Sequence, residues 1–198
     1  MNRGAHYFDE SPDAASAPRS VDLVLADLTV TLESDAGVFS ADQIDAGTRY
    51  LLMEAPAPDD HVRTALDLGC GYGPIARTLC ARAPRAHIWA VDVNERARTL
   101  AHHNLEGCHA TVAAPDDVPE DVRFDLIWSN PPIRIGKAAL HTLLHQWLDR
   151  LSPTGTAVLV VQKHLGADSL QRWLISQGWP TERIGSRQGY RLLEVKPR

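Results

Sequence analysis

Three groups of residues stand at the ends of apolar segments and could take part in chemistry. They are a glycine-rich run from Asp67 to Gly73 (DLGCGYG), an acid at Asp92, and Asn130-Pro131-Pro132. Glycines permit a tight turn and a close approach of backbone to ligand, and Pro74 suits the first turn of a helix with free N–H groups. An acid placed like Asp92 can accept both hydroxyls of a ribose. The first two groups therefore predict a nucleotide-type site.

The third group follows Phe124 to Trp128, which we expect to be a buried strand. Proline lacks an N–H donor and fixes φ, and the residue before it is pushed toward extended geometry. Asn130-Pro131-Pro132 therefore makes a stiff, non-helical exit from the strand. A plain strand end needs only one proline and no particular residue before it. The prolines explain a rigid backbone, but they do not explain the asparagine.

The glycine spacing separates two classes of cofactor. Dinucleotide sites use GxGxxG and place a pyrophosphate at the helix N-terminus, whereas this run reads GxGxG and is preceded by Asp67. An acid there would repel a pyrophosphate but would favour the ammonium of an amino-acid moiety. S-adenosylmethionine has that ammonium, a ribose and no phosphate. The spacing thus disfavours a nicotinamide dehydrogenase.

The surrounding pattern predicts the elements that position these groups. Val21–Leu25 and Leu28–Leu32 alternate with period two and indicate a hairpin, and a helix with Ile44 and Leu51 on one face follows. From Thr64 onward strands alternate with helices, which is typical of a parallel α/β sheet. The last two strands, near 181–184 and 190–195, are joined by a short link and should be antiparallel.

Composition limits the remaining possibilities. The chain has 198 residues, 44% of them hydrophobic, which fits one domain, with a hairpin-and-helix extension at 1–55 and a core at 56–198. We expect no signal peptide, no membrane span and a cytoplasmic location. Three cysteines without CxxC spacing argue against disulfides and zinc. His141 and His145 lack a third ligand, so we expect no metal.

Charge gives a weaker indication. The net charge of −5 is not typical of a nucleic-acid-binding protein, although basic residues gather between Thr181 and Arg198. That local excess is equally consistent with a solvated sheet edge.

The motifs together resemble a known family. DLGCGYG, VDVNE and SNPPI resemble class I S-adenosylmethionine-dependent methyltransferases. GVFS at Gly37–Ser40, Asp45-Ala46-Gly47, NPPIRIGK and QKHLGA are similar to the small-domain group related to the ribosomal small-subunit RNA guanine methyltransferase RsmC. The resemblance runs from about Tyr7 to the C-terminus. It implies an α/β fold with a Rossmann-like, seven-stranded methyltransferase sheet and an antiparallel last strand, preceded by the N-terminal hairpin and helix.

The resemblance also implies an activity. S-adenosylmethionine would be the cofactor and S-adenosylhomocysteine the product. The substrate would be the exocyclic amine of a guanine in structured RNA, such as ribosomal RNA or the small ribosomal subunit. Two alternatives remain open: a protein-glutamine methyltransferase, which also uses Asn-Pro-Pro, and a cofactor-binding ribosome-assembly factor without catalysis.

The implied site residues fall into three sets. In the catalytic set, the Asn130 oxygen and the Pro131 carbonyl accept the two amine hydrogens while Pro132 stiffens the exit. The cofactor set includes an adenine contact from Asp116. The substrate set supplies apolar contact to an extruded base and cations for phosphate. The cofactor set is Asp67, Gly69, Cys70, Gly71, Gly73, Asp92, Val93, Asp116 and Asn130, and the substrate set is Phe39, Ile133, Arg134 and Lys137.

Overall fold

The computed structural model describes residues 14–198. It begins with the predicted hairpin: β1 (Arg19–Val24) and β2 (Thr29–Ser34) form an antiparallel two-stranded sheet, with Leu23 opposite Val30. Helix α1 (Ala46–Glu54) follows, and Asp45 caps its N-terminus. The first thirteen residues of the predicted N-terminal extension lie outside the described residues.

The main sheet has seven strands in the order β5-β4-β3-β6-β7-β9-β8. Strands β3 to β7 are parallel, while β9 pairs antiparallel with both β7 and β8. This confirms the predicted Rossmann-like sheet and its antiparallel last strand. The strands are β3 (Thr64–Leu68), β4 (His87–Val91), β5 (Ala110–Ala113), β6 (Phe124–Ser129), β7 (Leu151–Gln162), β8 (Thr181–Arg187) and β9 (Tyr190–Val195).

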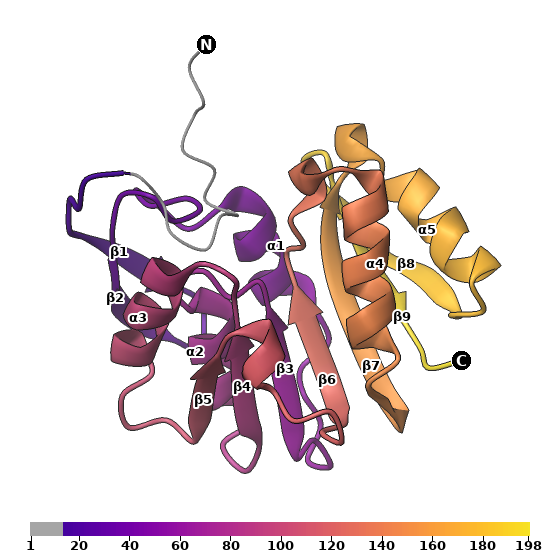
Figure 1. Cartoon of the computed structure of the whole chain (residues 1–198), viewed down its shortest axis with the longest axis horizontal. Coiled ribbons are helices and arrows are strands. Elements are labelled where there is room, and N and C mark those ends of the chain that lie inside the picture. The colour runs from indigo at the N-terminus through magenta and orange to yellow at the C-terminus, as the bar shows by residue number, and fades with distance from the viewer. Residues whose placement is uncertain (1–13) are drawn as a thin grey trace.

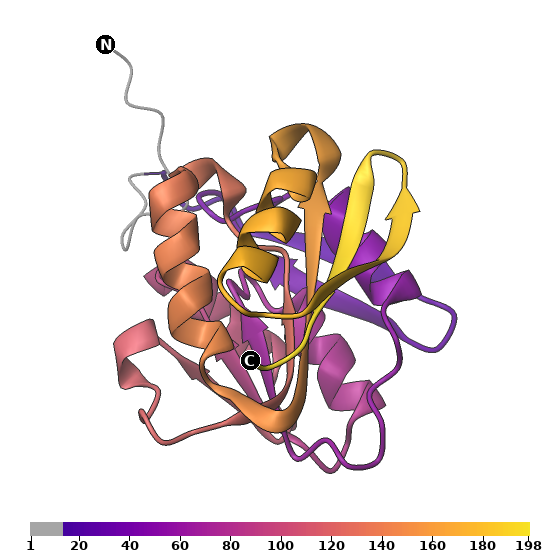
Figure 2. The ribbon, with the colours of Figure 1, turned by 90° about the vertical axis from the view of Figure 1, so that its right-hand side faces the viewer.

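Helices cover both faces of this sheet. Helices α1, α2 (Pro74–Arg82) and α3 (Glu95–Asn104) pack with the hairpin on one face, and α4 (Lys137–Leu148) and α5 (Ala167–Ser176) pack on the other. Figure 1 shows the hairpin beside α3 and the pair α4–α5 beside β7. Figure 2 shows the sheet between the two helical layers. No helix within residues 14–198 is long and apolar enough to cross a membrane.

Strand β6 is buried on both faces, as its apolar run predicts. Leu126 and Trp128 pack in the core beneath α1 and α2, and Ile127 packs in the core beneath α4. Phe124 packs in the same core, with its ring centroid 6.1 Å from that of Trp147 in α4. At the other end, the Ser129 hydroxyl donates to the Leu68 carbonyl at 2.6 Å. This bond joins the ends of β6 and β3, from which the two predicted loops leave.

The strand order also places those loops. From β3 the chain moves outward through β4 and β5, then returns to β6 on the other side of β3. The crossovers therefore diverge between β3 and β6. In open α/β sheets, ligands bind at the carboxyl ends of the strands at such a switch point.

Candidate active site

A cavity of about 480 Å³ lies at this switch point, within the range of small-molecule sites. It is lined by parts of the glycine loop, the end of β4, the exit of β6 and the end of β7. Residues from the N-terminal region close it on one side. Of the predicted site residues, those that line it are Phe39, Gly69, Cys70, Gly71, Asp92, Val93, Asn130, Pro131, Pro132, Ile133 and Arg134.

The glycine loop needs its glycines for conformation. Gly69 and Gly71 have φ of +75° and +55°, and no atom lies within 4 Å of a Cβ built on either one. A side chain there would be strained and would stand in open space of the cavity. Gly73, also left-handed, does not line the cavity. A Cβ on it would touch Ala101 at 3.5 Å, so it serves the packing of α2 on α3.

Cys70 lies in the loop but is buried. Burial raises the pKa of its thiol well above the ordinary value, with the nearby Asp92 and Asp67 carboxylates adding to the effect. A thiolate is the reactive form of cysteine, so a nucleophilic role is disfavoured.

Asp67 is fully buried and does not line the cavity. Its Oδ2 accepts a 2.9 Å hydrogen bond from the Ala76 N–H in the first turn of α2, and its Oδ1 has no partner among the described residues. Burial raises the pKa of Asp67 to about 8. Asp67 therefore joins β3 to α2 behind the loop, while its role toward an ammonium stays a prediction.

Asp92 stands at the cavity with both oxygens anchored. Oδ2 accepts from the Gly71 N–H and Oδ1 from the Asn94 N–H, both at 2.9 Å. Burial raises its pKa, although the two N–H donors act in the opposite direction. Each carboxylate oxygen can accept a further hydrogen bond, so the geometry suits a pair of vicinal hydroxyls.

Replacing Asp92 by alanine is expected to weaken S-adenosylmethionine binding by about 1.5 to 3 kcal/mol, the range for hydrogen bonds to a charged group. Calorimetric titration measures this. Asp117→Ala is the matched control, because Asp117 is exposed and does not line the cavity. Equal affinity of Asp92→Ala and wild type, at an unchanged melting temperature, would remove Asp92 from the site.

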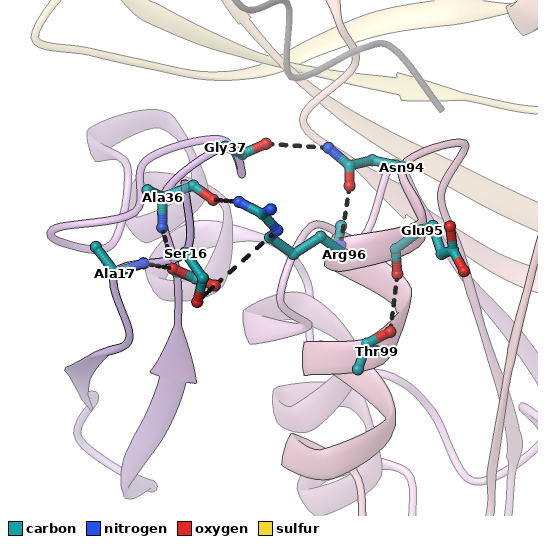
Figure 3. Close-up of polar contacts among 10 residues, drawn as sticks. Ser16, Ala17, Ala36, Gly37, Asn94, Glu95, Arg96 and Thr99 are labelled. Atoms are coloured by element: carbon teal, nitrogen blue, oxygen red, sulfur yellow. Dashed lines mark hydrogen bonds and ion pairs between the residues drawn. The ribbon is translucent and has the colours of Figure 1, made fainter. Parts of the chain in front are cut away.

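Asn94, two residues after Asp92, joins this part of the site to the N-terminal region (Figure 3). Asn94 caps α3 through a bond from the Ala97 N–H and donates its Nδ2 to the Gly37 carbonyl at 3.0 Å. Arg96 donates to the Ala36 carbonyl and lies 4.0 Å from the Asp35 carboxylate. The segment leading to Phe39 is thereby held against the start of α3 as one wall of the cavity.

Asn130 lines the cavity at the exit of β6. Its Nδ2 donates to the Asp45 carboxylate at 2.9 Å and to the Thr48 hydroxyl at 3.0 Å, both from the N-terminus of α1. Its Oδ1 accepts no hydrogen bond from residues 14–198. Both amide hydrogens are thus occupied by protein, and the oxygen remains available at the cavity.

The two prolines shape this exit as predicted. The Pro131 carbonyl accepts a 2.8 Å bond from the Ile133 N–H, and the Pro132 carbonyl accepts from Ile135. A carbonyl oxygen has two lone pairs, so Pro131 retains one for a ligand.

Some predicted residues lie away from the cavity. Asp116 sits in the short helix η1 (Pro115–Asp117), and Pro115 lines the cavity instead. Lys137 begins α4 and is exposed, also outside the lining. Neither residue lines the cavity, so their roles toward adenine and phosphate stay predictions.

The sequence analysis missed several lining residues. Asp45 and Thr48 come from the start of α1, Tyr72 from the glycine loop, Gln162 from the end of β7, and Leu165 from the short helix that follows it. Tyr190 opens β9 opposite Gln162. Gln162 could have been found, because it ends the strand beside β6 and so reaches the same edge of the sheet.

The basic residues near the C-terminus are largely paired. Arg187 contacts Glu54, Lys196 contacts Glu194 and Arg198 contacts Asp149. The buried Arg191 pairs with Asp168. Only Arg183 of this group has no ion pair among the described residues, so neighbouring acids offset most of the local positive charge on β8 and β9.

Comparison with known proteins agrees with this geometry. Residues 29–194 match the family model of the methyltransferase small domain. The chain belongs to this family. It is therefore an S-adenosylmethionine-dependent methyltransferase of the RsmC-like class I type, as the motifs predicted.

Curated relatives of this methyltransferase differ in how much of their own length this chain covers. The "uncharacterized protein YbxB" of Bacillus subtilis is 32% identical over 96% of this chain and 98% of its own length. The ribosomal RNA small subunit methyltransferase C of Aliivibrio fischeri is 33% identical over 69% of this chain. The alignment with the Aliivibrio protein covers only 42% of that protein's length.

Among solved structures, the T. thermophilus 16S rRNA N2 G1207 methyltransferase (RsmC), in complex with AdoMet and guanosine, has a TM-score of 0.79. Its sequence identity is 24%, over 93% of this chain and 52% of that one. A ribosomal protein L11 methylase from Lactobacillus delbrueckii has a TM-score of 0.62 at 21% identity. These likenesses establish the methyltransferase fold.

The residues of this small-domain methyltransferase fit S-adenosylmethionine, its cofactor. Gly69 and Gly71 leave a cradle that a Cβ would fill, and Asp92 presents anchored oxygens beside it. We propose that these three residues, with Val93, hold the cofactor.

Proposed function

We propose that this methyltransferase modifies the exocyclic amine of a guanine in ribosomal RNA, and that residues 1–198 act as one catalytic unit in the cytoplasm. The observation that carries the proposal is the state of Asn130. Protein groups occupy both of its amide hydrogens, while its oxygen accepts no hydrogen bond from residues 14–198 and stands at the cavity beside the glycine loop. An unbonded acceptor at this place suits a substrate that brings N–H donors.

Bound S-adenosylmethionine supplies an electrophilic methyl group. The amine of a nucleobase is a poor nucleophile, because its lone pair is delocalised into the ring. The Asn130 oxygen and the free lone pair of the Pro131 carbonyl would accept its two hydrogens, which orients the nitrogen lone pair. Positive charge then grows on the nitrogen between two acceptors, so both contacts strengthen in the transition state. The nitrogen afterwards loses a proton to solvent.

Apolar residues at the cavity mouth would hold the base. Ile133 follows the prolines, and Phe39 and Leu165 are both 40% exposed while lining the cavity. Large apolar side chains that stay exposed beside a cavity are typical of ligand contact. A base must leave its stack to reach such a site, which costs a few kcal/mol that these contacts would offset.

Three exposed cations favour RNA as the partner. Arg134 and Lys137 lie after β6, and Lys163 begins the short helix η3 (Lys163–Leu165) after β7. Within residues 14–198 none of the three makes an ion pair. Of these cations Arg134 lines the cavity, and exposed cations without ion pairs on the segments that follow β6 and β7 suit the phosphates of an RNA that extends beyond the base. The curated relatives named as ribosomal RNA methyltransferases support the same partner.

A protein-glutamine methyltransferase is the second candidate, since a primary amide also presents two hydrogens to Asn130. The unpaired cations favour RNA over it. A factor without catalysis is disfavoured, because the Asn130 acceptor is intact and held in place.

The proposal is tested with methyl-labelled S-adenosylmethionine and four substrates. Three come from cells lacking this protein, namely small ribosomal subunits, naked total RNA and the protein fraction, and the fourth is a short unstructured oligonucleotide that contains guanine. Nucleosides and amino acids are then separated by mass spectrometry. We expect label in guanine methylated on its exocyclic amine, from structured RNA or subunits and much less from a short unstructured oligonucleotide. Label in glutamine would favour the second candidate. Cofactor binding without transfer to any substrate would favour the factor without catalysis.

A further inference from the structure

The orientation of the Asn130 amide decides what the site can bind. An amide presents either an oxygen acceptor or an NH₂ donor, depending on a half-turn about its last bond. A substrate amine needs the acceptor. Something must therefore hold the amide in one of its two orientations.

Asp45 fixes the orientation of the Asn130 amide. A carboxylate can only accept hydrogen bonds, so its oxygen 2.9 Å from Asn130 requires the NH₂ group on that side. The reversed amide would place two acceptor oxygens against each other. Thr48 adds a second acceptor at 3.0 Å for the same NH₂ group.

Asp45 is itself fixed by the start of α1. Its Oδ2 accepts from the N–H groups of Gly47 and Thr48 at 2.8 and 3.0 Å, as an N-cap. A Cβ on Gly47 would stand 2.9 Å from that oxygen and 2.7 Å from the Tyr190 ring. Glycine at 47 thus leaves room for the carboxylate and Tyr190 side by side. The Asp45 carboxylate that faces Asn130 is therefore held both by the N–H groups at the start of α1 and by its packing beside Tyr190.

We propose that Asp45, with Thr48, is a positioning residue that locks Asn130 with its oxygen toward the substrate. The inference rests on the proposed function of Asn130. It assigns to the first turn of α1 the selection of substrates that present N–H donors. A reversed amide would instead favour a group that accepts hydrogen bonds.

The alternative is that Asp45 serves only as a helix cap, and two variants separate these roles. Serine is as good an N-cap as aspartate but is shorter, so Asp45→Ser keeps the cap and loses the contact with Asn130. Asparagine keeps an oxygen that can serve both the cap and Asn130. We expect the single-turnover rate of methyl transfer to small ribosomal subunits to fall about tenfold in Asp45→Ser and to recover mostly in Asp45→Asn. The dissociation constant of S-adenosylmethionine should stay within about twofold.

A double-mutant cycle gives the decisive readout. In an Asn130→Ala background, Asp45→Ser should cause no further loss of rate, because the group it positions is gone. An equal proportional loss in both backgrounds would overturn the proposal. So would a wild-type rate in Asp45→Ser alone. If Asp45→Ser does not fold, Thr48→Val replaces it in the same double-mutant cycle. This substitution removes the hydroxyl acceptor of Asn130 and leaves the shape of the side chain nearly unchanged.

The two proposals fail in different ways. A wild-type rate in Asn130→Ala would contradict the proposed function itself. If Asn130→Ala transfers methyl slowly while Asp45→Ser transfers it at the wild-type rate, only the positioning role of Asp45 is contradicted.

Discussion

Asn130→Ala is expected to transfer methyl about a hundredfold more slowly than wild type, comparable to the loss of one preorganised electrostatic contact. The Asn130 oxygen accepts no hydrogen bond from residues 14–198. In the proposed mechanism its hydrogen bond with the substrate amine is strongest when positive charge develops on the substrate nitrogen. Cofactor affinity should change much less, because the glycine loop and Asp92 remain. Single-turnover transfer and calorimetric titration separate the two effects.

Asn104→Ala is the matched control for this variant. Asn104 also makes several hydrogen bonds, to the backbone of Glu33 and Tyr72, but it does not line the cavity. It should lower the melting temperature and leave the transfer rate within about threefold. Wild-type transfer by Asn130→Ala would mean that the Asn-Pro-Pro exit only ends a strand.

Asp67→Asn is expected to flatten the dependence of stability on pH. Burial raises the pKa of Asp67 to about 8 in the folded protein, against about 3.9 for an unfolded chain. The folded state therefore holds this proton more tightly. Its contribution to stability is fully present below about pH 4 and is lost as the pH rises toward 8. One such group changes the free energy of unfolding by at most about 1.4 kcal/mol per pH unit, or about 4 kcal/mol between pH 5 and pH 8.

Urea unfolding at pH 5 and pH 8 measures this effect. Asparagine does not titrate, so the variant should lose less stability over that interval than wild type. Asp117→Asn, at an exposed position without a side-chain partner among residues 14–198, is the control and should follow wild type. Parallel pH profiles for Asp67→Asn and wild type would show that Asp67 is ionised in the folded protein.

The sequence predicted the parts of the site that depend on local pattern. The glycine loop, Asp92 and Asn130 each follow an apolar segment, and parallel strands bring their carboxyl ends to one edge. Alternation of strands and helices was enough to place these three together. The hairpin and the antiparallel last strands followed from period-two patterns and a short link.

The contacts that the sequence did not predict are long-range. Asp45 and Asn130 are 85 positions apart, and nothing in either local pattern indicates that they meet. Arg191 and Arg198 looked like a basic patch until acids from α5 and the end of α4 proved to be their partners. Asp116 lies in a 3₁₀ turn of which Pro115 is the residue that lines the cavity, so its contact with the adenine stays a prediction. The spacing of residues along the sequence does not predict side-chain contacts that depend on tertiary packing.

The bonds from Asn94 and Arg96 to Gly37 and Ala36 have a consequence for the lifetime of the protein. They make the chain just after the hairpin a wall of the cavity in which we propose that the cofactor binds, so local opening of the hairpin would disrupt that proposed site. A ligand that binds only the closed form lowers the open population in proportion to its concentration over its dissociation constant. The supply of S-adenosylmethionine in the cell would then set how often this region opens to proteases, and methyl-donor starvation would shorten the survival of the enzyme.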